Sequence, residues 1–171
     1  INIFEIIESA KTKPFGFQAF YPGPGYGGHC IPIDPFLLSW KAKKYNFRTK
    51  FIELSGKINE NMPNIICRRV KHFLKNKKNK LCLIIGLAYK KNVDDMRESP
   101  SLKIIENLEK NNIKCDYHDP YISGIKKLRK FKKSKKSVSL KISNIKKYDA
   151  IILATDHDKI KFMEELIIQK N

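Results

Sequence analysis

The chain has 171 residues, of which 42% are hydrophobic, and a formal net charge of +18. A chain of this length and apolar content can bury a core, and its longest apolar runs are only as long as strands, so we expect a soluble protein that does not enter a membrane. The lysines are spread over nearly the whole sequence, whereas a nucleic-acid-binding protein concentrates them in a patch, so we expect no nucleic-acid partner.

The first part of the chain is predicted to be helical on both sides of one loop. Apolar residues recur at helical spacing over residues 1–12. Because this pattern is already under way at the first residue, which is not Met, the chain is expected to begin inside a helix, as a fragment would. Residues 13–33 are predicted to form a loop, and a helix is predicted from Pro35 to about Tyr45.

A second apolar pattern predicts a long helical segment. It runs from Phe51 to Leu74 with a spacing of three or four residues, which indicates one amphipathic helix or two helices on one axis. Asn61 can cap a second helix and Pro63 is tolerated in a first turn, so these residues mark the possible break. Both interpretations stay open.

Residues 80–171 are predicted to form an α/β domain, separated from a first domain of residues 1–75 by a polar linker. Its first strand, helix and second strand form a βαβ unit, which implies parallel strands. The basic run 126–136 is predicted to be an exposed loop or a frayed helix. The predicted elements are strands at 81–85, 113–118 and 150–154 and helices at 101–110 and about 159–168.

A loop rich in glycine and proline precedes a single cysteine. Residues 20–35 read FYPGPGYGGHCIPIDP. This mixture is typical of a loop with a defined backbone shape and not of a core segment, because Gly permits close approach of a ligand while Pro fixes φ. Cys30 lies just before the predicted helix, where unpaired N–H groups and the helix dipole favour the nucleophilic thiolate. Asp34 is predicted to cap this helix, with action as a base for a water near the sulfur as the alternative.

Two simpler interpretations of this loop are rejected. Its glycines match the spacing of the dinucleotide pattern G-x-G-x-x-G, but that pattern is meaningful only between a strand and a helix, and residues 17–21 make a poor strand. A single cysteine is most often a buried thiol. Cys30 differs because a glycine loop precedes it and a helix start follows.

The four cysteines share no metal-ligand or disulfide spacing, so we expect no metal site and a reducing, cytoplasmic setting.

A second loop concentrates charged residues. It follows the strand at 81–85 and includes Lys90, Lys91, two aspartates and Arg97 before the start of a helix. Ligands of open α/β sheets bind beyond the carboxyl ends of the strands, and cations together with helix N–H groups can hold phosphates. A phosphate or pyrophosphate site is therefore one interpretation, and a solvated charged loop is the other.

These motifs resemble those of a known family. GPGYGGHCIPIDP at 23–35 is similar to the catalytic-cysteine segment of the nucleotide-sugar 6-dehydrogenases, the UDP-glucose and GDP-mannose dehydrogenase family. With residues 11–21 it looks most like the branch that acts on UDP-N-acetylglucosamine. GLAYK at 86–90 and DDMRESP at 94–100 resemble the signature of the family's UDP-binding domain. The resemblance implies an α/β fold, with a helical central-domain segment followed by a Rossmann-like parallel-sheet UDP-binding domain, incomplete at both ends.

The resemblance also implies roles for individual residues. Cys30 matches the catalytic nucleophile, and Asp34 matches the carboxylate that assists beside it. Arg97 falls on a position that reaches the cofactor NAD. The positions that match substrate-binding residues are Tyr21, Gly23, Gly25, Tyr26, Gly27, Tyr89 and Lys90.

The implied activity is NAD-dependent oxidation of the C6 alcohol of a UDP-sugar to a uronic acid through a cysteine thioester, for surface polysaccharide synthesis. The helical first part implies a homodimer. The chain has no dinucleotide fingerprint between a strand and a helix, so the NAD domain is expected upstream and these residues alone are expected to be inactive. The alternatives are a non-catalytic UDP-sugar-binding and dimerisation module, and a basic nucleic-acid binder that uses residues 126–136.

Overall fold

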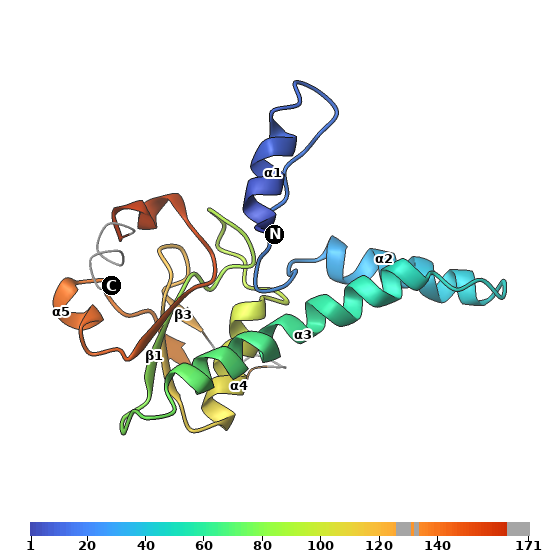
Figure 1. The fold of residues 1–171 in the computed structure, drawn as a ribbon. Helices are drawn as coiled ribbons and strands as arrows, with labels where there is room; N and C mark the ends of the chain where they lie inside the picture. Colours follow the sequence, from blue (N-terminus) through green and yellow to red (C-terminus); the bar gives the residue numbers. More distant parts are fainter. Residues whose placement is uncertain (126–130, 132–133, 164–171) are drawn as a thin grey trace.

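The computed structural model describes residues 1–125, 131 and 134–163. An α/β part is built on a parallel sheet, while α1 and the neighbouring helices α2 and α3 extend away from it (Figure 1). The elements in chain order are α1 (Ile3–Lys11), α2 (Cys30–Lys43), α3 (Lys50–Phe73), β1 (Leu81–Ile85), α4 (Pro100–Lys110), β2 (Lys114–His118), β3 (Gly124–Ile125), β4 (Lys135–Lys136), α5 (Ile142–Ile145), β5 (Ala150–Leu153) and the 3₁₀ helix η1 (Asp158–Met163).

The main sheet has the strand order β2-β1-β5, and both of its strand pairs are parallel. Its centre is β1, which is covered on both faces. Cys82 and Ile84 pack with α3 and α4, whereas Leu83 and Ile85 pack with Tyr148 on the opposite face. Burial on both faces explains why β1 is a continuous apolar run. The predicted βαβ unit and the third strand are confirmed.

Helices α2 and α3 lie side by side as an arm (Figure 1). Helix α3 is one continuous helix, so the alternative of two helices is wrong. Pro63 lies inside it without breaking it, but its missing N–H leaves the carbonyl of Asn59 without a helical partner. Gly56 lets α2 approach, because a Cβ there would lie 2.4 Å from the Phe36 ring.

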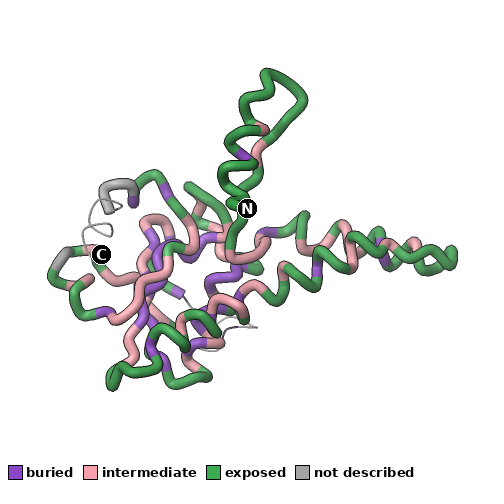
Figure 2. Tube along the Cα trace, in the orientation of Figure 1, coloured by how far each residue is buried: buried purple, intermediate pink, exposed green. Residues whose placement is uncertain are grey.

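The α1 helix and the α2–α3 arm expose many large apolar side chains, whereas the buried residues concentrate around the main sheet (Figure 2). Exposed apolar residues that gather on one part of a protein are typical of an interaction face. None of the helices in the described ranges is long and apolar enough to cross a membrane. The exposed apolar residues of the arm include Ile31, Leu37, Leu38, Trp40, Phe47, Phe51, Leu54 and Ile58.

Two sequence predictions in the last third differ from the structure. In the basic run, Phe131 is buried and Lys135–Lys136 form β4, which pairs with β3, so an exposed loop or frayed helix is wrong at these positions. The rest of that prediction, at 126–130 and 132–133, lies outside the described residues. The helix predicted near the end is a 3₁₀ helix at Asp158–Met163, and its expected continuation also lies outside the described residues.

Candidate functional site

Two loops that the sequence singled out separately lie against each other in the structure. We call residues 22–29 the glycine loop and residues 86–99 the β1–α4 loop. A Cβ on Gly27 would lie 2.6 Å from the Cβ of Tyr89 and 3.0 Å from the carbonyl oxygen of Glu98. Real Cβ atoms do not approach this closely, so glycine is what lets the two loops touch.

Gly28 strengthens the same contact through its backbone. Its φ of 86° is in the region that glycine adopts readily, and its N–H donates to the carbonyl of Arg97 over 2.9 Å. A Cβ there would lie 2.6 Å from the ring of Tyr89. Because Cys30 follows two residues later, the position of this contact determines where α2 and its thiol begin.

Other residues predicted for the substrate site lie further from this contact. The hydroxyl of Tyr21 donates to Glu8 of α1, which holds the ring beside that helix. Gly23 has open space where a side chain would be, so packing does not explain its glycine. Gly25 lies over α3, and an added Cβ would be 3.2 Å from the carbonyl oxygen of Asn59 that Pro63 leaves without a helical partner.

Tyr26 carries a buried hydroxyl with no hydrogen-bond partner among the described residues. Its ring packs against Phe36, with centroids 6.5 Å apart. Burial, and then the charge of Glu60, raise the pKa of Tyr26 above its ordinary value. The phenol therefore stays protonated, and its hydroxyl lies on the α3 side, 3.7 Å from where a Cβ on Gly56 would be.

Helix α2 begins at Cys30 rather than at Pro35, so the prediction that Asp34 caps the helix is wrong. His29 occupies the cap position without a side-chain hydrogen bond, and Pro32 fits the first turn, where no N–H is needed. Pro35 lies inside the helix. Cys30 and Asp34 are both exposed, and their separation of four residues puts them on one helical face. A carboxylate thus lies one turn from the thiol at the helix N-terminus.

The β1–α4 loop presents charged groups next to Tyr89. Lys90 is exposed, with its Nζ 5.5 Å from the centroid of the Tyr89 ring. Arg97 donates from Nε and Nη2 to the carboxylate of Asp95, with a shortest distance of 2.6 Å. The guanidinium lowers the pKa of Asp95, and the carboxylate raises that of Arg97. Ser99 caps α4 by accepting from the backbone N–H of Ser101.

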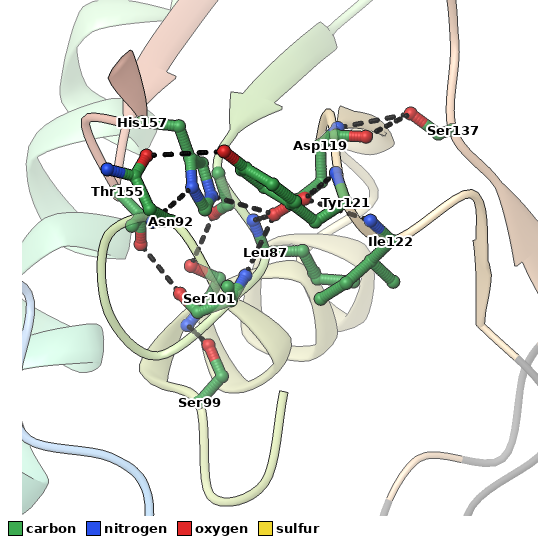
Figure 3. A network of polar contacts seen from close by, with 12 residues as sticks. Leu87, Asn92, Ser99, Ser101, Asp119, Tyr121, Ile122, Ser137, Thr155 and His157 are labelled. Carbon is green, nitrogen blue, oxygen red and sulfur yellow. Dashed lines mark hydrogen bonds and ion pairs between the residues drawn. The ribbon is translucent and has the colours of Figure 1, made fainter. Parts of the chain in front are cut away.

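Behind the β1–α4 loop lies a polar network that the sequence analysis missed (Figure 3). The carboxylate of Asp119, 3% exposed, accepts backbone N–H groups of Leu87 and Ala88 and of two residues in its own turn. It also accepts from Nε2 of His157, 0% exposed, over 3.1 Å. Burial raises the pKa of Asp119, but these N–H groups and His157 outweigh it, so the pKa lies below its ordinary value.

One sequence signal could have found this network. Asp119 directly follows β2 and His157 closely follows β5, and the carboxyl ends of parallel strands meet at one edge of a sheet. The β1–α4 loop starts at that same edge. Among the described residues, no group of three His, Cys, Asp or Glu side chains is arranged to hold a metal ion.

Comparisons with known proteins agree with this arrangement. The central-domain model of the UDP-glucose/GDP-mannose dehydrogenase family matches residues 1–61, and the family's UDP binding domain model matches residues 83–170. A UDP-N-acetyl-D-mannosamine dehydrogenase of Methanococcus vannielii is 35% identical over 164 residues, which are 94% of this chain and 35% of that protein.

Solved structures give the same result. A UDP-D-ManNAc dehydrogenase from Pyrococcus horikoshii matches 99% of this chain and 38% of its own, with a TM-score of 0.77 and 32% identity. A UDP-glucose dehydrogenase from Pyrobaculum islandicum, 21% identical over 94% of this chain and 37% of its own, shows the fold alone with a TM-score of 0.79. The chain thus spans little more than a third of the length of these relatives. The Methanococcus vannielii and Pyrococcus horikoshii proteins, which are 35% and 32% identical to this chain, are named for N-acetylmannosamine. Neither name contains the N-acetylglucosamine that residues 11–21 led us to expect.

The family matches cover both predicted parts of the chain and confirm the resemblance inferred from its two motifs. The Rossmann-like α/β architecture of the structural relatives is also the predicted one. The chain belongs to the UDP-glucose/GDP-mannose dehydrogenase family.

Proposed function

We propose that the chain is the part of an NAD-dependent nucleotide-sugar 6-dehydrogenase that binds the UDP-sugar and supplies the catalytic cysteine. The observation that carries this proposal is the contact of Gly27 and Gly28 with Tyr89, which brings the cysteine segment to the carboxyl edge of the parallel sheet. Residues 1–75 and 80–171 act as its two domains, and the substrate lies where they meet.

The UDP part of the substrate is assigned to the β1–α4 loop and the glycine loop. Lys90 offers an exposed ammonium that can pair with a phosphate. Tyr89 forms one wall, and Tyr26 remains a proposed substrate contact, although its hydroxyl is buried beside α3. Tyr21, Gly23, Gly25 and Gly27 remain proposed substrate contacts, although Tyr21 is bonded to α1 in this structure.

Cys30 is proposed as the nucleophile and Asp34 as the group that orients water. The thiolate of Cys30, at the start of α2, adds to the C6 aldehyde, which forms a carbon–sulfur bond. After oxidation the product is a thioester. Asp34, on the same face, holds or deprotonates the water that cleaves it and returns the thiolate.

NAD, when bound, accepts the hydrides of the oxidation. Arg97 is the proposed contact of this chain with the cofactor, and its geometry fits such a role. Asp95 occupies Nε and Nη2 of the exposed guanidinium, and no described residue is hydrogen-bonded to Nη1. The carboxylate therefore orients the side chain while leaving Nη1 for a hydroxyl or phosphate of the cofactor.

The substrate is proposed to be a UDP-N-acetylhexosamine. The two relatives named above that are 35% and 32% identical to this chain over the aligned residues favour the mannosamine epimer over the glucosamine epimer. We further propose a cytoplasmic homodimer, formed through the exposed apolar faces of α2 and α3, that acts in surface polysaccharide synthesis.

The test has two parts. Isothermal titration of this chain with UDP, GDP and the two UDP-N-acetylhexosamines should show binding of the uridine ligands and none of GDP. The enzyme that contains this chain should produce two NADH per sugar with its preferred epimer, and Cys30→Ala should abolish or stall this. No affinity for UDP would overturn the nucleotide assignment. NADH production unaffected by Cys30→Ala would overturn the role of the cysteine and leave a non-catalytic binding module.

A further inference from the structure

His157 uses both of its ring nitrogens inside the protein. Nδ1 accepts the backbone N–H of Asn92 over 2.9 Å, so this nitrogen carries no proton. The proton is on Nε2, which donates to Asp119 over 3.1 Å. The imidazole is therefore a rigid link between a buried carboxylate and the backbone of the β1–α4 loop (Figure 3).

Asn92 is the point where this link reaches the loop. Its φ of 60° is left-handed, a conformation that asparagine adopts more readily than most other non-glycine residues. Its side chain donates to the carboxylate of Asp158 over 2.5 Å and accepts the N–H of Asp158 over 3.0 Å. The middle of the loop is thus fixed to the segment that follows β5 by its backbone and by its side chain.

The start of the loop is fixed as well. The hydroxyl of Thr155 donates to the carbonyl of Ala88 over 2.7 Å, and the hydroxyl of Ser101 to that of Gly86 over 2.9 Å. Between Ala88 and Asn92 lie Tyr89 and Lys90, which are proposed to meet the substrate. Their position therefore depends on the anchor at Asn92 as well as on the strand before them and on the bond of 2.9 Å from the Tyr89 N–H to the carbonyl of Asp95.

We infer that Asp119, His157 and Asn92 are positioning residues that hold Tyr89 and Lys90, and through Tyr89 the glycine loop, in the arrangement that binds UDP. This inference rests on the proposed function. Asp119 anchors the imidazole, the imidazole holds the N–H of Asn92, and the loop then presents Tyr89 to Gly27 and Gly28. Through Asn92 and Tyr89, the buried pair of Asp119 and His157 thus affects the position of the glycine loop that leads to Cys30.

Two substitutions of His157 separate its two contacts. The side-chain amide of asparagine lies near the place of Nδ1, so His157→Asn keeps an acceptor for Asn92 and loses the donor to Asp119. The amide of glutamine lies near the place of Nε2, so His157→Gln keeps the donor and loses the acceptor. Both remove a buried ring, and both should lower the thermal stability of the chain.

The first readout is the affinity of the chain for UDP, measured by isothermal titration. The dissociation constant should rise about tenfold with His157→Gln, which loses the bond to the loop, and this corresponds to ~1.4 kcal/mol. It should rise by a smaller factor, about threefold, with His157→Asn, which keeps the bond to the loop but loses its anchor at Asp119. Tyr148→Phe is the matched stability control, because it removes a partly buried hydrogen bond of 2.8 Å to Asp116 on the other face of the sheet. It should lower the melting temperature and leave the affinity unchanged.

The second readout needs no ligand. Hydrogen exchange by NMR should show a protected amide at Asn92 and at Gly28 in the unsubstituted chain and in His157→Asn, and fast exchange at both in His157→Gln. If the unsubstituted chain does not bind UDP, the proposed function fails, while the exchange data still decide the positioning role. Equal affinities for the two His157 variants, or losses that follow stability as in Tyr148→Phe, would overturn the inference.

Discussion

Replacing Gly28 by alanine tests whether the glycine loop is seated on Tyr89. The new Cβ would lie 2.6, 2.8 and 3.0 Å from three atoms of the Tyr89 ring, well inside the contact distance of carbon atoms. In addition, the φ of 86° is strained for any residue with a Cβ. Gly28→Ala therefore combines a steric conflict with a backbone conflict at one position.

The magnitude follows from these two parts. A residue held in a sparsely populated backbone region costs ~1–3 kcal/mol. Overpacking against a neighbour that cannot withdraw costs another ~1–3 kcal/mol. Gly28→Ala should therefore lower the free energy of unfolding, measured by urea denaturation, by about 2–6 kcal/mol. In a Tyr89→Ala background the steric part disappears, and the same substitution should cost only ~1–3 kcal/mol.

Gly23→Ala is the matched control in the same loop. Nothing lies within 4 Å of a Cβ at this position, so the expected change is within about 0.5 kcal/mol. A Gly28→Ala variant as stable as Gly23→Ala, or one whose cost is the same with and without the Tyr89 ring, would refute the contact between the two loops.

Two further predictions concern Asp119 and the thiols. The pKa of Asp119 is below its ordinary value of about 4, so the ionised carboxylate stabilises the folded state above about pH 4. This stabilisation is lost as the pH falls through the lowered pKa of Asp119. Asp119→Asn should cost at least ~2 kcal/mol at pH 7 in urea denaturation and flatten the acid side of the stability profile; an unchanged profile would contradict the network. Of the four free cysteines only Cys30 is exposed, so a thiol reagent should modify one cysteine quickly in the native chain and four after unfolding. A Cys30→Ser variant that still reacts quickly would contradict this burial.

The main sheet was predictable because its strands leave strong local patterns. Strand β1 is apolar at every position, since both of its faces are covered, and its bounds at 81–85 are as predicted. The short strands β3 and β4, of two residues each, leave no pattern of their own. They form because Gly124–Ile125 and Lys135–Lys136 meet in space, which local periodicity does not report.

The start of α2 shows where a local signal misled. Asp34 followed by proline has the form of a helix cap, yet the helix already includes Cys30. Two prolines occupy its first turns, and the glycine loop packed on Tyr89 places the chain so that the helix can begin earlier. Tertiary contact thus overrides the capping preference of a single residue.

The candidate site was predictable as two motifs and not as one structure. The cysteine segment and the β1–α4 loop were each recognisable from their residues, but their contact at Gly28 depends on how α3 and α4 pack. The link from Asp119 to His157 joins residues that follow different strands. Such a link is set by sheet topology, so no window of the sequence contains it.

The order of strands in the sheet has a consequence for how the chain folds. Cys82 of β1 pairs with Cys115 of β2, but it also pairs with Ala150 of β5, much further along the chain. Closing the longer span costs more chain entropy, so β1, α4 and β2 should come together before β5 joins them. His157 arrives with β5 and is the anchor of the β1–α4 loop. A nascent or partly folded chain therefore has both sequence motifs, but the proposed nucleotide site is not formed until β5 is in place.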